Sequence, residues 1–518
     1  MNNRSRTLNN TFFSSVGLYT EYVLGMLTSV LIARYLGPDG FGTYSLVIWM
    51  VGMGVAISNS GTASAAIKFV AELRGSEQHE LIPYMLDYLR RAQHVFLLVV
   101  VLGGTAVFGF TGERIAPGTN HWVLLGFLVV AVALRASYMF NIGVAKGFEN
   151  FRVTALVALV STPINLVLVL LAWKMSVPVE GLLAVFVVSS FVFFGMSRYL
   201  IAPLVPKRKP GTQLPPPLLA RVRRHMMWTA LTVSVGFFVT SEVEVMFLNI
   251  YADSHAAGQF KVAYQLAVGA ALLVPGVFGA LLLPMMASAL SRGREFAARR
   301  FVSTTAYLTL LAAPLMAFGV VFGGDIIQLM YGAEYAAAGP VFVFCLIGAC
   351  LAMMTSGASS LLVSADRQSS ILLLAIVCGL IKLGLDAVLI AYFGLTGATI
   401  AFVSMAGISA VAYIALGCRV SHAQLEWGRL ARILFAAVLA GLAVWPLRGQ
   451  WLPWAMVPLG GAVVGLLYTL LTLLLGCWSR GDIEHMQHLH LRFVAGHPRF
   501  GARLLEWAHH RAHAGGAT

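Results

Sequence analysis

Long apolar runs alternate with short polar stretches from one end of the chain to the other. Runs of about 20 residues, the length of a transmembrane helix, occur fourteen times. Their approximate bounds are 12–35, 43–67, 92–111, 121–144, 153–173, 179–201, 226–250, 260–287, 301–323, 339–363, 370–392, 396–417, 430–447 and 454–477. The pattern predicts an all-α polytopic membrane protein with about 14 transmembrane helices.

The segment that joins the first two runs recurs later in the chain. This segment, residues 31–46, reads LIARYLGPDGFGTYSL, and its Pro-x-Gly-x-Gly core cannot stay helical for long, so a tight helical hairpin is predicted. Three of its positions recur at an offset of 216, where Tyr35, Gly42 and Tyr44 return as Tyr251, Gly258 and Phe260. A match at one constant offset indicates an internal duplication.

The duplication predicts the domain organisation. Each copy contains six runs, an even number, so both copies enter the membrane in the same direction and form two pseudo-symmetric six-helix lobes. The expected divisions are an N-lobe at 1–201, a basic cytoplasmic linker at 202–225, a C-lobe at 226–417, two added helices at 418–477 and a cytoplasmic tail at 478–518. The tail is rich in His and Arg, but its spacing does not guarantee convergent metal ligands, so we expect a solvated segment.

Positive charges collect on one side of this layout. The chain has 35 Lys and Arg against 21 Asp and Glu, a net charge of +14. With the amino terminus in the cytoplasm, 27 of the 35 fall on the cytoplasmic side, five fall outside, and three lie within runs. This asymmetry follows the positive-inside rule and predicts that both termini are cytoplasmic. The membrane topology and contact with anionic lipids therefore explain the excess of basic over acidic residues, and no nucleic-acid partner is expected.

The three basic residues within runs are Arg135, Lys382 and Lys68. A charge at the bilayer centre costs about 2.5–3.5 kcal/mol on insertion scales, so each must face water, a partner or the surface. Arg135 lies about 16 Å from the inner end of its helix, near the midplane, and either lines a wet cleft or pairs with an acid on another helix. Lys382 and Asp386 share a helix face and either neutralise each other or face the cleft, whereas Lys68 could extend to the inner surface.

Three further acids lie within apolar runs. Glu21 is about 20 Å from the outer end of the first helix. Glu242 and Glu244 are two residues apart and point in different directions, so one could line a cleft while the other pairs with a basic residue. Carboxylates in surroundings of low dielectric constant suit coupling to an ion, and the sequence leaves H⁺ and Na⁺ open. No other cofactor is expected, because no Cys-x-x-Cys pair or phosphate-loop motif occurs in a suitable context.

Two stretches resemble a known family. The pattern Arg-Tyr-Leu-Gly-Pro-x-x-Phe-Gly-x-Tyr at Arg34 to Tyr44 is similar to the first hairpin of polysaccharide flippases of the multidrug/oligosaccharidyl-lipid/polysaccharide exporter superfamily. The stretch 58–73, SNSGTASAAIKFVAEL, resembles the second segment of that family, although Asn59 and Lys68 replace its frequent Asp and Arg. The resemblance covers most of the chain. Because an asparagine stands where the family often has an aspartate, the ion-coupling role that the resemblance would give to that position is in doubt at Asn59.

The resemblance implies a transporter and not an enzyme. Such a protein flips a polyprenyl-(pyro)phosphate-linked oligosaccharide across the bacterial inner membrane by alternating access, for export of lipopolysaccharide or exopolysaccharide. We expect a monomer whose partners are the lipid-linked oligosaccharide, membrane lipids, a polysaccharide polymerase and glycosyltransferases. The candidate substrate-binding residues are Arg135, Lys382, Lys68 and Asn59, and the candidate ion-coupling residues are Glu21, Glu242, Glu244 and Asp386.

Two alternatives belong to other functional classes. A drug/cation antiporter of the same superfamily would favour an acidic cleft, whereas the deep basic residues of this chain favour an anionic substrate. An integral membrane polysaccharide polymerase or ligase would need acids or histidines on a sizeable outer loop, and the predicted outer loops are short and consist mostly of Gly, Ala and Pro.

Overall fold

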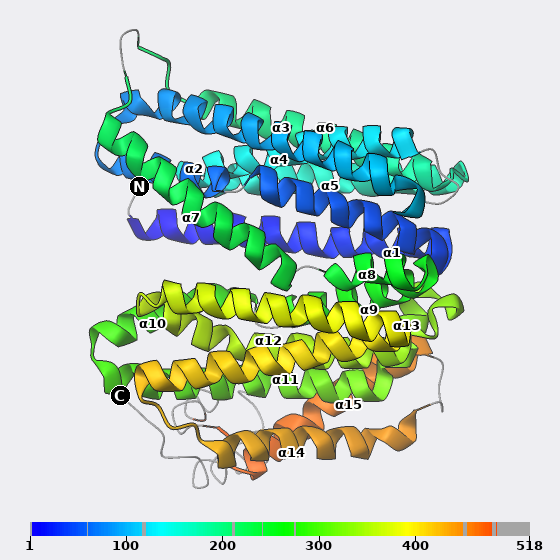
Figure 1. The fold of residues 1–518 in the computed structure, drawn as a ribbon. Coiled ribbons are helices and arrows are strands. Elements are labelled where there is room, and N and C mark those ends of the chain that lie inside the picture. Colours follow the sequence, from blue (N-terminus) through cyan, green and yellow to red (C-terminus); the bar gives the residue numbers. More distant parts are fainter. Residues whose placement is uncertain are drawn as a thin grey trace. The chain divides into compact units, whose positions relative to one another are not determined.

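The protein is all-helical in the residues that the structure, a computed structural model, describes (Figure 1). These are residues 3–59, 61–115, 121–209, 213–240, 242–273, 276–448, 453–478 and 483. Within them, ten helices are long and apolar enough to cross a membrane. The prediction of an all-α polytopic membrane protein is therefore confirmed. The His-rich tail beyond Trp478 lies outside the described residues apart from Ile483.

The helices follow the predicted apolar runs. Their bounds are α1 (Asn3–Ser58), α2 (Thr62–Gly75), α3 (Ile82–Ile115), α4 (His121–Gly147), α5 (Phe151–Lys174), α6 (Val179–Ile201), α7 (Pro216–Thr240), α8 (Val243–Tyr251), α9 (Ser254–Leu273), α10 (Gly276–Ser291), α11 (Arg294–Tyr331), α12 (Ala338–Ser364), α13 (Gln368–Ser421), α14 (Trp427–Val444) and α15 (Pro453–Leu474). Short 3-10 turns flank several of them, at His79–Leu81, Ala202–Leu204, Ala333–Tyr335 and Trp445–Leu447.

Helices α1 and α13 each contain two predicted runs and a break between them. The break in α1 is at Gly37, with φ 65°, and the break in α13 is at Gly394, with φ 53°. Positive φ is readily adopted only by glycine, and Pro38 then removes a backbone donor from the next helical turn. The break in α1 therefore lies one residue before the predicted Pro-x-Gly-x-Gly core, whose Pro38, Gly40 and Gly42 are themselves helical.

Helix bounds also repeat at the offset of 216. Adding 216 to the bounds of α4 gives 337–363, and α12 spans Ala338–Ser364. The same offset relates Gly394, where α13 breaks, to Pro178, the residue just before α6. The duplication found in a few residues therefore extends to the placement of helices and of breaks.

The chain forms two compact units. The first contains the described residues of 1–262 and 375–398, and the second contains the described residues of 263–374 and 399–478. In the first unit α1 packs against α5, and α4 packs against α2 and α6, around buried side chains such as Phe69 and Phe140. In the second unit α11 packs against α12, α14 and α15. Small residues such as Ala436 and Ala440 let α14 approach its neighbours closely.

Within the first unit, the two copies of the repeated segment cross each other at two glycines. A Cβ atom added at Gly42 would meet the Ser254 carbonyl, and one added at Gly258 would meet the Pro38 carbonyl. Pro38 and Ser254 are themselves 216 residues apart, so each contact is the counterpart of the other. This reciprocal pattern is that of a pseudo-two-fold axis, and Pro-x-x-x-Gly against Ser-x-x-x-Gly is a small-residue helix crossing.

Candidate functional site

Arg135 lies on α4, and α6 supplies most of its contacts. Its guanidinium carbon is 4.8 Å from the ring centroid of Phe186 and 4.4 Å from that of Phe193. Its Nε donates a hydrogen bond of 3.0 Å to the Ser190 hydroxyl. Aromatic faces stabilise a cation that has lost water, so α6 forms a support that holds the guanidinium in one orientation.

No acid pairs with Arg135 among the described residues. Its hydrogen bond to Ser190 uses Nε, and the two terminal nitrogens have no bonding partner within the described part of the chain. Glu21, Tyr44 and Tyr138 are close enough to affect it electrostatically, but Glu21 is exposed and makes no ion pair with a described residue. Of the two interpretations open from the sequence, this geometry favours an unpaired cation whose forked end can accept an anion.

Asn59 lies beside this cation, where α1 ends. Its Nδ2 donates to the Ala136 carbonyl at 3.1 Å, and its Oδ1 accepts a hydrogen bond of 3.0 Å from Gln93. Gln93 also donates to the Ala136 carbonyl at 2.8 Å. The amide therefore ties α1 and α3 to the residue that follows Arg135. A carboxylate at this position could not donate to that carbonyl, which gives Asn59 a structural role in this chain.

Lys68 lies on α2 and is exposed. Its Nζ is 5.4 Å from the Phe69 ring centroid. The nearby His225 on α7 is 3.2 Å from the Ser64 hydroxyl, and burial, followed by the Lys68 charge, lowers its pKa. Snorkelling to the inner surface and substrate contact by Lys68 both stay predictions.

Lys382, Glu244 and Asp386 form a buried triad in the first unit. Lys382 Nζ donates a hydrogen bond to Glu244 Oε1 and lies 3.5 Å from Asp386 Oδ2. The Lys382 side chain is 3% exposed, and the two carboxylates are 0% exposed. For Lys382 this geometry favours a role with the two acids over contact with a phosphate, because its ammonium already has two anionic partners.

Glu242 forms a separate ion pair. Its carboxylate accepts a hydrogen bond from Lys261 on α9, and both side chains are partly exposed, 21% and 15% respectively. Glu242 directly precedes α8, so the chain turns between Glu242 and Glu244 and sends them to different partners. The prediction that these two acids face different surroundings agrees with this placement, although their coupling roles stay predictions.

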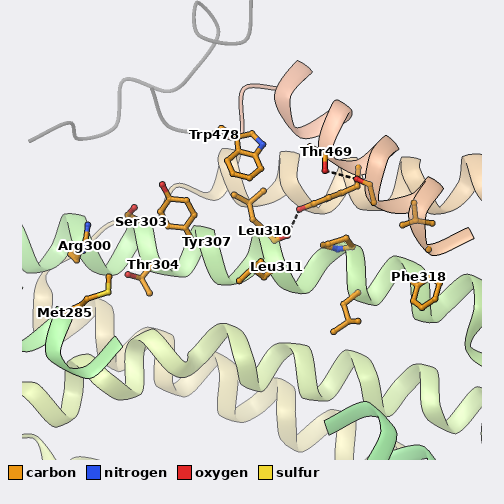
Figure 2. A pocket seen from close by; sticks show the side chains of 16 residues that line it. Met285, Arg300, Ser303, Thr304, Tyr307, Leu310, Leu311, Phe318, Thr469 and Trp478 are labelled. Carbon is orange, nitrogen blue, oxygen red and sulfur yellow. Dashed lines mark hydrogen bonds between the residues drawn. The ribbon is translucent and has the colours of Figure 1, made fainter. Parts of the chain in front are cut away.

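The second unit contains a cavity of about 870 Å³ along α11 and α15. Figure 2 shows the side chains that line it, from Arg300 toward one end of α11 to Phe318 farther along the helix. Its wall is mostly apolar, and Tyr307 and Trp478 add aromatic rings. Such a lining suits a hydrocarbon chain better than a sugar, whose hydroxyls would lack partners.

A sequence comparison identifies the family. A model of the family described as "Polysaccharide biosynthesis protein" matches residues 7–290, more than half of the chain. The chain belongs to this polysaccharide biosynthesis protein family. No curated protein sequence matches it.

Solved structures of transporters have a fold similar to that of this family member. A structure entitled "Lipid II flippase MurJ, inward closed conformation" is 15% identical, with a TM-score of 0.71 over 89% of this chain and 98% of that one. An inward-facing multidrug resistance MATE family transporter of the MOP superfamily is 16% identical, with a TM-score of 0.61 over 79% and 98%. A MOP superfamily transporter from Pyrococcus furiosus is 16% identical, with a TM-score of 0.54 over 80% and 95%. The family member therefore has a flippase-type transporter fold.

Several residues around the candidate site were not predicted. Ser190, Phe186 and Phe193 hold Arg135, and Gln93 holds Asn59. The adjacent serines at 189 and 190 interrupt an apolar helix and were the available signal for this part of the site. The aromatic residues gave no signal, because phenylalanines are common in any transmembrane helix.

Proposed function

We propose that this protein flips a polyprenyl-(pyro)phosphate-linked oligosaccharide across the bacterial inner membrane. Membership of the polysaccharide biosynthesis protein family and the flippase-type fold support a transport function of this kind. The glycan serves a cell-surface polysaccharide such as lipopolysaccharide or an exopolysaccharide. A polymerase and glycosyltransferases act on either side of this step.

The physical problem is to move sugar hydroxyls through hydrocarbon. An unpaired hydroxyl in an apolar medium costs several kcal/mol, so a short glycan would meet a barrier of tens of kcal/mol without a polar route. Alternating access between two similar lobes removes that barrier, because the glycan exchanges one aqueous side for the other inside protein. The polyprenyl tail needs no such route and stays in apolar surroundings.

The observation that carries the proposal is the state of Arg135. A charge halfway along an apolar helix costs free energy of insertion. The Arg135 guanidinium contacts two aromatic rings and donates a hydrogen bond to a serine, but its two terminal nitrogens have no acid partner among the described residues. A guanidinium fork matches two phosphate oxygens, so it suits the anionic link between prenyl chain and sugar. The same charge repels a cationic drug, which disfavours the antiporter alternative.

The test is a flipping assay in proteoliposomes with a fluorescent prenyl-pyrophosphate-linked oligosaccharide. Arg135→Ala should abolish flipping, and Arg135→Lys should retain part of it, because lysine keeps the charge and loses the fork. Arg34→Lys is the matched control, since this residue lies near the outer end of its helix. Normal flipping by Arg135→Ala, in protein that folds as well as the wild type, would overturn the proposal.

A further inference from the structure

The buried triad on α8 and α13 has an odd charge. Glu244 and Asp386 each carry a negative charge when ionised, and Lys382 supplies the single positive charge, so the three sum to −1. Glu244 Oε2 and Asp386 Oδ1 have no hydrogen-bond partner among the described residues. A buried net charge with unsatisfied oxygens is unfavourable, so the site needs one more positive charge.

The charged groups that act on Lys382 and Asp386 are members of the triad. The electrostatic interactions of Lys382 are with Glu244 and Asp386, and those of Asp386 are with Glu244 and Lys382. Glu242 is two residues from Glu244, but Lys261 neutralises it. Within the described residues, the missing positive charge is therefore not supplied by another side chain.

A metal cation does not suit the remaining space. Cations that prefer oxygen ligands need several of them around one point, and here the ammonium of Lys382 already occupies the position between the two carboxylates. A second cation placed there would also be repelled by that ammonium at close range. A proton has neither difficulty, because it binds to one carboxylate oxygen and needs no further ligands.

We propose that the triad is a proton site and that Lys382 is the residue that specifies H⁺ over Na⁺. One proton binds to a carboxylate oxygen of Glu244 or Asp386, which converts the net charge from −1 to zero. Release of the same proton restores the charge. This inference deepens the proposed function, because it rests on the proposed transport and names H⁺ as the ion that is coupled to it.

The first experiment measures thermal stability of the full-length protein in lipid nanodiscs, in NaCl or choline chloride of equal ionic strength. The wild-type Tm should be the same in both salts, because the ammonium of Lys382 keeps Na⁺ out of the triad. In Lys382→Gln the ammonium is replaced by an amide oxygen, so the two carboxylates can bind Na⁺, and NaCl should raise the Tm by about 2 °C or more. Lys261→Gln is the matched control, because Glu242 has only one carboxylate, and it should show no response.

The second experiment covers the case in which Lys382→Gln does not fold. Infrared difference spectra of the wild type between acidic and basic pH should contain one carbonyl band of a protonated carboxyl that is missing from the spectra of Glu244→Gln, whereas the bands of the other carboxyl groups should be common to both. That substitution leaves one lysine and one aspartate, a neutral pair, so it should fold while losing the proton. A wild-type Tm that rises in NaCl, or the absence of the carboxyl band, overturns the inference.

These measurements also separate the inference from the proposed function. Neither the Tm nor the infrared band depends on a transported substrate, so the proton site would stand if the protein moved a different anion. Conversely, stabilisation of the wild type by Na⁺ would refute the proton site and leave the proposal of oligosaccharide flipping untouched.

Discussion

The glycine crossing within the first unit gives a prediction whose magnitude can be worked out. In Gly42→Ala the new Cβ would lie 2.7 Å from the Ser254 carbonyl carbon and 3.0 Å from the Gly258 nitrogen. In Gly258→Ala it would lie 2.8 Å from the Pro38 carbonyl carbon and 3.1 Å from the Pro38 Cα. These neighbours are backbone atoms, so only a displacement of whole helices relieves the clash.

The right control is Gly103→Ala on α3, where an added Cβ has no neighbour within 4 Å. Each variant gains the same helix propensity, up to about 1 kcal/mol, so the difference between them isolates the steric cost. Overpacking costs about 1–3 kcal/mol. For a unit of this size, roughly 2 °C of Tm corresponds to 1 kcal/mol, so Gly42→Ala should melt about 2–6 °C below Gly103→Ala.

Thermal unfolding followed by tryptophan fluorescence measures these differences, and the double variant tests the geometry. Both added methyl groups clash at the same crossing, so one displacement of the helices relieves both clashes. Gly42→Ala together with Gly258→Ala should therefore lower the Tm by clearly less than the sum of the two single decreases. If Gly42→Ala has the same Tm as Gly103→Ala, or if the Tm decreases of the two single variants add up in the double variant, the reciprocal contact is not formed.

Two further predictions concern topology and coupling. Single cysteines should react with an impermeant reagent from outside at Gly118, Gly332 and Gln450 but not at Gly211 or Gly515, and outside labelling at Gly211 would refute the charge-based layout. At least one of Glu21→Gln, Glu242→Gln and Glu244→Gln should lower ion-dependent flipping without loss of folded protein, as measured across a pH series in proteoliposomes. Unchanged flipping by all three at every pH would place coupling elsewhere.

Most of the fold could be predicted because it depends on local properties. A transmembrane helix needs a fixed length of apolar residues, and Gly and Pro favour a break, so the runs and the interruptions at Gly37 and Gly394 leave a signal in the sequence. The break between α7 and α8 was not predicted. The run 226–250 contains no Pro, and its one glycine, Gly236, lies inside α7.

The candidate site could be predicted only residue by residue. The free-energy cost of placing a charge in the bilayer shows that each charged residue in a helix must contact water or a partner, but it does not show which partner. For Lys382 the sequence showed Asp386 four residues away on the same helix, and that pair alone is neutral. Glu244 is 138 residues away in the chain, and its contact with Lys382 follows from tertiary packing.

The difference between the two deep cations follows from this packing. Arg135 is surrounded by aromatic rings and a serine, which support a positive charge without neutralising it, so it keeps its attraction for an anion from outside the protein. Lys382 is surrounded by two acids, which exceed its charge, so the triad attracts a positive charge instead. If Arg135 binds the anionic lipid head and the triad binds H⁺, as proposed, the first unit contains a site for each. A conformational change that alters the surroundings of both sites would link the two binding events, since each ligand would then favour one conformation over the other.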